Sequence, residues 1–461
     1  MGAVRRPGDD EGWRVRGRWG RGRAGRSGPS AGGRVGAVTL ASVMALAPAG
    51  VLPGRTAVAD EAAGDAGAYA FAEDARSVDG AVSTADAVER LEPGRTYRST
   101  LPASGTVYYR LELDGVTSTY ASATAVPPAG RTASVIDGVK VAVQDGEGRS
   151  CDVDTASFGT AGSPHPVAAW AMREISPRKS LCQESGTYYL SVERVDPDGE
   201  GSSPGPWEME LTTVSEPPPA RAGATSAPKE WNSAPPQPFT GQPERRSGGS
   251  GFTRAAPVGQ GVWRDDIRPG RTLFYKVPVD WGQQLHVTAE LGGSSTGKGR
   301  YTAAALDLDL YNPVRGRVVD VGVGYDGVRK AGSLVPLPPV AYVNRHAAVR
   351  QVGAMRFAGS YYLVAHLSAA VADAFGDGPV PLTLRVRLSG APQDGPGYAG
   401  ESVPSDVFTV TEGDREAAAE GEDAGGDAAF RALAVGGIGT GTALLAGLGV
   451  WALAARRRTV P

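Results

Sequence analysis

The feature that most constrains the fold is an internal duplication of short, alternating segments. Residues 91–114 (LEPGRTYRSTLPASGTVYYRLELD) align without a gap with residues 257–280 (PVGQGVWRDDIRPGRTLFYKVPVD). The matched positions include Tyr97 and Trp263, Leu101 and Ile267, Tyr109 and Tyr275, and Asp114 and Asp280. Apolar residues recur at every second position, as on the buried face of a β-strand. The chain therefore contains two copies of one β-rich unit.

Three later blocks repeat in the same order. They pair residues 139–143 (VKVAV) with 306–310 (LDLDL), GTYYLSV at Gly186 with GSYYLVA at Gly359, and Leu211 with Leu384. The spacing changes only between blocks, as expected when insertions fall in loops. The glycine before each late tyrosine pair permits a sharp turn into the strand. Chance resemblance between aromatic-rich strands is the alternative, and four ordered blocks argue against it.

The long central region has many short alternating stretches separated by Gly, Pro, Asp and Ser. This pattern is typical of β-sandwiches and barrels. We predict an all-β fold with two tandem β-sandwich (jelly-roll-like) domains and one C-terminal transmembrane α-helix. The predicted parts are a signal peptide (1–59), an N-terminal mature segment (60–74), β-sandwich domain 1 (75–214), a Pro/Gly/Ser-rich linker (215–251), β-sandwich domain 2 (252–389), an acidic stalk (390–431), the transmembrane helix (432–455) and a cytoplasmic tail (456–461).

The predicted transmembrane helix is an uncharged run over residues 432–455. As a helix it would be about 36 Å long, enough for a hydrocarbon core of about 30 Å. The arginines at 456–458 favour a cytoplasmic C-terminus. A buried core helix is the alternative, but the run is longer and more uniformly apolar than that role requires. We expect a cell-membrane protein that contacts the lipid bilayer through this helix, with its sandwiches outside.

The N-terminal segment has the pattern of an export signal. Arginine-rich residues 1–34 precede an apolar run at 35–52, and Ala57-Val58-Ala59 supplies a small-x-small cleavage pattern. The basic region is unusually long, which an early start assignment or a specialised export route would explain. An uncleaved membrane helix is the alternative, although prolines interrupt the apolar run.

The chain has two cysteines, Cys151 and Cys182. In an oxidising compartment we expect them to form a disulfide. The bond would stabilise domain 1 by roughly 3–4 kcal/mol on the chain-entropy model. A zinc site needs more ligands than two cysteines provide, and a free catalytic thiol is the remaining alternative.

The charge of the chain limits the classes of partner that it can bind. Acidic residues number 50 and basic residues 47, and removal of the arginine-rich signal would leave a distinctly acidic chain. An acidic surface without a basic cluster argues against nucleic acid as a partner. The partner class that we expect is therefore an extracellular protein or polysaccharide.

The repeated blocks resemble the bacterial pre-peptidase C-terminal (PPC) domain family. The blocks that carry the resemblance are 274–277 (FYKV), 306–313 (LDLDLYNP) and 359–363 (GSYYL) in domain 2, and Tyr108-Tyr109 and 186–190 (GTYYL) in domain 1. Domain 1 departs from the family at 139–143, where VKVAV replaces the D-L-x-L-Y strand. The resemblance implies small β-sandwiches with accessory roles, such as binding polymers, assisting secretion or packing against an enzyme domain.

We find no catalytic constellation and predict no enzyme activity, no catalytic residues and no cofactor-binding residues. The four histidines are scattered, without an HExxH motif, and no GxSxG elbow occurs. They are His165, His286, His346 and His366. We interpret His286 and His366 as ordinary strand residues.

Calcium is the one cofactor that the sequence suggests. Asp196, Asp198 and Glu200 place oxygen ligands close together in the turn sequence DPDGEG, which is well short of an EF-hand loop. A solvated turn without metal is the alternative. We predict no other metal ligands.

Two further acidic pairs alternate along predicted strands, so that both members of each pair share a face. They are Asp152 with Asp154, and Asp307 with Asp309. We interpret both pairs as parts of an outward, solvated polar face.

The leading hypothesis is a non-enzymatic, single-pass cell-surface protein whose two sandwiches bind an extracellular protein or polysaccharide. One alternative is an accessory subunit of a membrane or secretion complex, with the helix and stalk as the contact. Another is a hydrolase with a site assembled from scattered acids.

Overall fold

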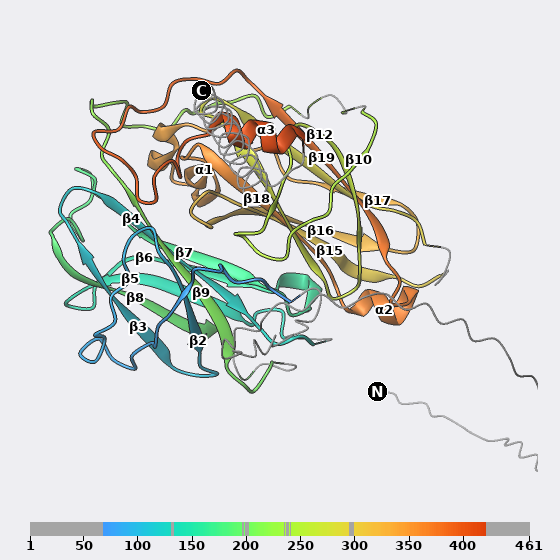
Figure 1. Cartoon of the computed structure of the whole chain (residues 1–461), viewed down its shortest axis with the longest axis horizontal. Helices are drawn as coiled ribbons and strands as arrows, with labels where there is room; N and C mark the ends of the chain where they lie inside the picture. The colour runs from blue at the N-terminus through green and yellow to red at the C-terminus, as the bar shows by residue number, and fades with distance from the viewer. Residues whose placement is uncertain are drawn as a thin grey trace, which may run out of the picture. The chain divides into compact units, whose positions relative to one another are not determined.

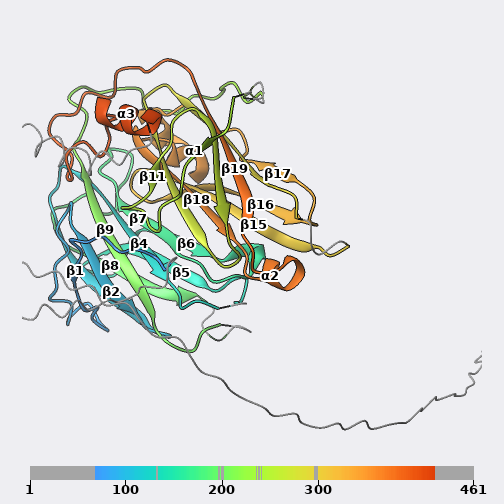
Figure 2. The same cartoon turned by 45° about the vertical axis from the view of Figure 1, so that its right-hand side comes forward.

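A computed structural model describes residues 68–420, apart from 131–132, 196–197, 199–201, 235, 237–238, 240 and 295–298. The described residues form an all-β structure with four sheets and a few short helices (Figures 1 and 2). None of the helices within the described ranges is long and apolar enough to cross a membrane. The predicted signal peptide and the predicted helix at 432–455 lie outside the described residues.

The first sandwich consists of two sheets, with strand orders β1-β2-β9-β4-β7 and β3-β8-β5-β6. Its elements are β1 (Arg76–Ser77), β2 (Thr96–Leu101), β3 (Thr106–Leu113), β4 (Ser118–Val126), β5 (Gly138–Asp145), β6 (Ser150–Ser157), η1 (Gly159–Ala161), β7 (Val167–Arg173), β8 (Gly186–Val195) and β9 (Trp207–Glu216).

The second sandwich has sheets with strand orders β10-β12-β19-β14-β17 and β11-β13-β18-β15-β16. Its elements are β10 (Glu244–Arg245), β11 (Ala256–Pro257), β12 (Gly261–Ile267), β13 (Thr272–Val279), β14 (Gln284–Leu291), β15 (Thr302–Tyr311), β16 (Arg317–Tyr325), β17 (Lys330–Ser333), η2 (Tyr342–His346), α1 (Arg350–Ala354), β18 (Gly359–Leu367), α2 (Ala370–Phe375) and β19 (Val380–Ser389). Helix α3 (Glu412–Glu420) follows.

Apart from the two-residue strands β1, β10 and β11, each sandwich has eight described strands, four in each of its two sheets. Counted from β2 or from β12, one sheet holds the first, eighth, third and sixth strands in that order. The other sheet holds the second, seventh, fourth and fifth. This is the double-sheet arrangement of a jelly roll, and both copies have it.

Strand register confirms the predicted duplication residue by residue. In the first and second sandwich respectively, the equivalent ladder pairs are Tyr97–Leu211 and Trp263–Leu384, Tyr109–Leu190 and Tyr275–Leu363, and Val143–Leu190 and Leu310–Leu363. Because a slip of one residue would turn every side chain to the opposite face, the alternating apolar positions fix these pairings.

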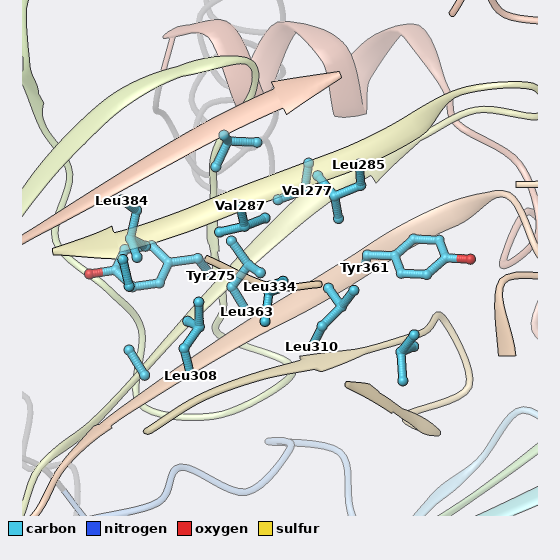
Figure 3. Close-up of a cluster of buried hydrophobic side chains, with 14 of the residues drawn as sticks. Tyr275, Val277, Leu285, Val287, Leu308, Leu310, Leu334, Tyr361, Leu363 and Leu384 are labelled. Carbon is cyan, nitrogen blue, oxygen red and sulfur yellow. The ribbon is translucent and has the colours of Figure 1, made fainter. Parts of the chain in front are cut away.

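The alternation of apolar and polar residues along the strands also forms the hydrophobic cores. In β3 every second residue is buried, and β8 and β14 show the same pattern over most of their length. Figure 3 shows how side chains from both sheets of the second sandwich meet. They include Tyr275, Val277, Leu285, Val287, Leu308, Leu310, Leu363 and Leu384.

The predicted disulfide between Cys151 and Cys182 is confirmed. It links β6 to the segment before β8, so it closes one edge of the first sandwich. Cys182 is almost fully buried in the core of this sandwich, and Cys151 packs against that core.

Two predicted boundaries require correction. Strand β10, at Glu244–Arg245, pairs in parallel with β12, so part of the predicted linker 215–251 belongs to the second sandwich. The predicted stalk is wrong for residues 390–420, because Phe408 is 2% exposed within the core and Gly259 donates its N–H to the carbonyl of Ala418 in α3. Apolar residues before and within the acidic run cause this packing. Residues 421–431 lie outside the described residues.

Candidate functional site at the junction of the sandwiches

One outer face of the first sandwich is covered by the second sandwich. Every residue of β7 is buried, and so is nearly every residue of β4. Tyr120 and Trp170 from these strands share a continuous apolar cluster with the core of the second sandwich. A Cβ on Gly316 would lie 2.5 Å from the Trp170 ring, so only glycine permits this close approach. The covered face is therefore a packed junction.

A buried carboxylate lies at the centre of one polar group in this junction. Arg345 of η2 donates to both oxygens of Glu216, at 2.6 and 2.8 Å. The hydroxyls of Tyr120 and Tyr398 donate to the same carboxylate, at 2.6 and 2.8 Å. Four donated hydrogen bonds satisfy the buried charge, as burial requires. This group ties the end of β9 to the second sandwich.

Two further buried ion pairs cross the junction. Arg315 donates to Glu210, which also accepts from the hydroxyl of Tyr69 at 3.0 Å. Arg356 donates to Glu174 at 2.8 Å. Removal of one partner from such a pair leaves an uncompensated buried charge. The pairs therefore resist separation of the sandwiches.

A cleft of about 320 Å³ opens along this junction. Its lining contains five prolines, two aromatic rings and charged or polar side chains: Pro127, Pro128, Pro164, Pro166, Pro206, Tyr69, Phe274, His165, Glu208, Arg271 and Thr272. Tyr69 and Phe274 pack edge to face, with ring centroids 5.7 Å apart. The volume is at the small end of the range of about 300–1,000 Å³ typical of ligand pockets. Prolines restrict the backbone of the walls, so the cleft is preformed.

The two acidic pairs do not form a solvated face, contrary to the sequence-based interpretation. Asp152 and Asp154 form ion pairs with Arg350, the first residue of α1. Asp307 and Asp309 are 8% and 3% exposed. These side chains do point outward from their own sandwich, but the facing sandwich covers that surface.

Two of the four histidines meet in the junction. His165 precedes β7, and His366 lies in β18; their rings stack with centroids 4.4 Å apart. Burial lowers the pKa of both imidazoles below the usual range. His366 is thus more than the ordinary strand residue that we expected. By contrast, His286 lies on β14, where its ring contacts the hydroxyl of Ser389.

Of the candidate calcium ligands, Asp198 is described and lies in a turn, whereas Asp196 and Glu200 lie outside the described residues. Calcium binding there stays a prediction. Another group of potential ligands was missed from the sequence: His165, Asp307 and Asp309 come together across the junction. The sequence separates His165 from the aspartates by a whole sandwich, so no spacing motif could reveal the group. The alternation of the two aspartates was the available signal.

No protein-family model matches the chain, and no curated protein matches it in sequence. Among solved structures, the chain is similar to a periplasmic inhibitor of g-type lysozyme from Aeromonas hydrophila, with 15% identity over 32% of this chain and 100% of that one, and a TM-score of 0.17. It is similar to tandem CBM51 modules of a family 98 glycoside hydrolase from Streptococcus pneumoniae, with 8% identity over 62% and 83% of the two chains and a TM-score of 0.16.

A tandem CBM22 domain from Paenibacillus barcinonensis is 10% identical over 66% of this chain and 90% of that one, with a TM-score of 0.16. TM-scores this low carry no argument about function. The two tandem β-sandwiches stand on the strand pairing described above, and the resemblance to PPC domains stays a prediction.

Proposed function

We propose that this chain is a non-enzymatic, single-pass cell-surface protein whose two PPC-like sandwiches act as one unit that binds an extracellular polysaccharide or protein. The cleft between the sandwiches is the proposed binding site, and it is the observation that carries the proposal. Its proline-rich walls suit an apolar group of a ligand. Glu208 and Arg271 add charged groups of both signs. The volume suits one sugar ring or one protruding side chain.

The junction supports a single binding unit. Buried ion pairs and a shared apolar cluster join the sandwiches. A ligand in a cleft between loosely joined domains would have to order them, at a cost in free energy. A packed junction removes that cost, so both walls of the cleft are held in place before the ligand arrives.

A cleft-filling substitution tests the binding site. Ala129 lines the cleft and is exposed, so Ala129→Trp should block the cleft without disturbing a buried group. We expect the variant to lose crosslinking to its partner on intact cells. The matched control is Ala348→Trp, an exposed alanine outside the cleft lining, which should keep crosslinking. Equal crosslinking by both variants would exclude the cleft, and hydrolysis of peptide or glycan at a catalytic rate would exclude a non-enzymatic role.

The competing hypothesis is an accessory subunit of a membrane or secretion complex. Its support is the uncharged run at 432–455, which membrane fractionation of the full chain tests directly. Pull-down from membranes with and without residues 428–461 separates the hypotheses. Loss of the partner only when the helix is removed favours the accessory role, whereas loss on removal of a sandwich favours recognition by the sandwiches.

A further inference from the structure

A cluster of three metal-ligand types lies in the junction, beside the cleft. His165 comes from the loop before β7 of the first sandwich, and Asp307 and Asp309 come from β15 of the second. One ligand atom from each residue lies within 4.8 Å of the others. Because Asp307 and Asp309 are two residues apart on one strand, their carboxylates project from the same face. All three residues are buried or nearly so, at 4%, 8% and 3% exposure.

The imidazole of His165 is held in the state that binds metal. Its Nδ1 lies 2.8 Å from the backbone carbonyl oxygen of Ser163. A carbonyl can only accept, so Nδ1 bears the proton and Nε2 of the neutral ring keeps a lone pair. Metal-binding histidines typically donate their second ring N–H to a carbonyl or carboxylate in this way.

The carboxylates of Asp307 and Asp309 carry more negative charge than the neighbouring Arg317 can balance. Arg317 donates from Nε to Asp309 at 2.5 Å and also pairs with Asp320 at 3.2 Å. Within the part of the chain that the structure describes, Asp307 has no ion-pair partner. A buried carboxylate within 4.8 Å of a second carboxylate oxygen and of an imidazole nitrogen is a site for a cation.

The surroundings hold the cluster in place. His366 stacks on His165, and its two ring nitrogens lie 3.0 Å from the hydroxyl of Thr272 and 2.9 Å from the hydroxyl of Ser163. His366 is therefore occupied and cannot be a fourth ligand without losing these contacts. It instead positions Ser163, whose carbonyl orients His165. His165 also lines the cleft, which provides a path for an ion from solvent.

We propose that His165, Asp307 and Asp309 form a zinc-binding site that bridges the two sandwiches. One nitrogen and two carboxylate oxygens, with water at the open position, match the ligands of zinc. Calcium requires six to eight oxygen ligands and does not favour imidazole. Since the ligands come from both sandwiches, the bound ion clamps the junction. This site is separate from the predicted calcium turn, and it does not depend on which ligand the cleft binds.

The test uses the full-length chain in detergent, stripped with a chelator and reloaded with Zn²⁺. We expect about one zinc per chain by elemental analysis and a rise in the unfolding temperature on loading. Asp307→Asn keeps the side-chain volume and removes the charge. It should weaken zinc binding at least about 100-fold in competition with a chromophoric chelator, because even outer-shell changes cost about 10–100-fold.

The matched control is Asp326→Asn, which removes an exposed ion pair with Lys330 outside the ligand cluster and its supporting charges, and should keep zinc affinity. Cobalt(II) loading gives a second measurement, since its visible spectrum should show nitrogen coordination that His165→Gln removes. Circular dichroism establishes that each variant is folded. No stoichiometric zinc in the parent chain, unchanged affinity in Asp307→Asn, or a preference for calcium over zinc would each overturn the proposal.

Discussion

The two sandwiches close the same edge with different chemistry. The first joins β6 to the segment before β8 through Cys151 and Cys182. By the register of the neighbouring strands, the equivalent positions in the second sandwich are Val318 and Met355. Both residues are buried in the second core. A covalent link in one copy is thus replaced by apolar packing in the other.

The difference follows from what each sandwich buries. The second core includes residues from α1, α2 and the segment around Phe408, in addition to its strands. The first core is drawn almost entirely from strands and carries the disulfide. Since stability rises with the apolar area that folding buries, the smaller core gains more from a cross-link. A disulfide and a larger core are therefore alternative ways to stabilise one strand arrangement.

A second contrast concerns a repeated tyrosine. The hydroxyl of Tyr109 pairs with Ser99 at 2.8 Å, whereas that of Tyr275 donates to Asp265 at 2.8 Å. The strand alignment makes Ser99 and Asp265 equivalent. The second copy therefore has a charged acceptor where the first has a neutral hydroxyl.

The largest expected effect comes from uncoupling the two sandwiches. Arg345→Ala leaves the buried Glu216 without its cation, which should cost about 3–5 kcal/mol. Chemical denaturation should then show two transitions, one for each sandwich, in place of a single coupled one. The control Arg76→Ala removes an exposed pair with Glu92 and should cost no more than about 1 kcal/mol. A single transition of unchanged midpoint in Arg345→Ala would show that the junction pair contributes little.

Loss of the disulfide should come next. The double variant Cys151→Ser, Cys182→Ser should destabilise the first sandwich by about 3–4 kcal/mol, because the unfolded chain regains the freedom of the closed loop. Combined with Arg345→Ala, it should move only the transition of the first sandwich. Reductant should have the same effect on the parent chain and none on the double variant. A shift in both transitions would mean that the stability of the second sandwich also depends on the disulfide, contrary to the difference between the two cores.

The tyrosine contrast should give a smaller effect. Tyr275→Phe removes a hydrogen bond to a charged acceptor and should cost about 1.5–3 kcal/mol, against about 1 kcal/mol for Tyr109→Phe. Urea denaturation measures both. Tyr301→Phe, at a residue 68% exposed, is the control and should be neutral. Equal costs in the two sandwiches would show that the charge of Asp265 adds nothing to the bond.

The repeat predicted the strand pairing because alternation is a local property with a fixed period. Tyr109 and Tyr275 occupy equivalent positions for that reason. The short first strands, β1 and β10, escaped prediction, since two polar residues such as Glu244 and Arg245 have no period. They are defined by pairing with a distant strand, which only the fold supplies.

The junction was missed for a different physical reason. An outward polar face such as that of Asp307 and Asp309 has the same pattern whether water or another sandwich covers it. A signal did exist in β7, where VAAWAMR carries apolar residues on both faces until its last position. Strands buried on both faces read as continuous apolar runs. The sequence therefore indicates that this face of the first sandwich is covered, but it does not indicate which part of the molecule covers it.

The smallest expected effect is a dependence of the junction on pH. Burial alone would raise the pKa of Glu174, but the charges of Arg356 and Lys179 lower it below the usual range. Unfolded glutamate has a pKa of about 4.3, so Glu174 stabilises the folded state above that pH, and the contribution is lost as the pH falls through the lower folded value. Because Glu174 belongs to the junction and not to either core, acid should loosen the contact between the sandwiches.

Unfolding midpoints measured from about pH 6 down to pH 3 test this dependence. Glu174→Gln cannot titrate, so its midpoint should start lower and fall less steeply than that of the parent chain. Glu147→Gln, whose side chain is 73% exposed, is the matched control and should follow the parent curve. Parallel curves for the parent chain and Glu174→Gln would show that the titration of Glu174 does not make the junction sensitive to pH.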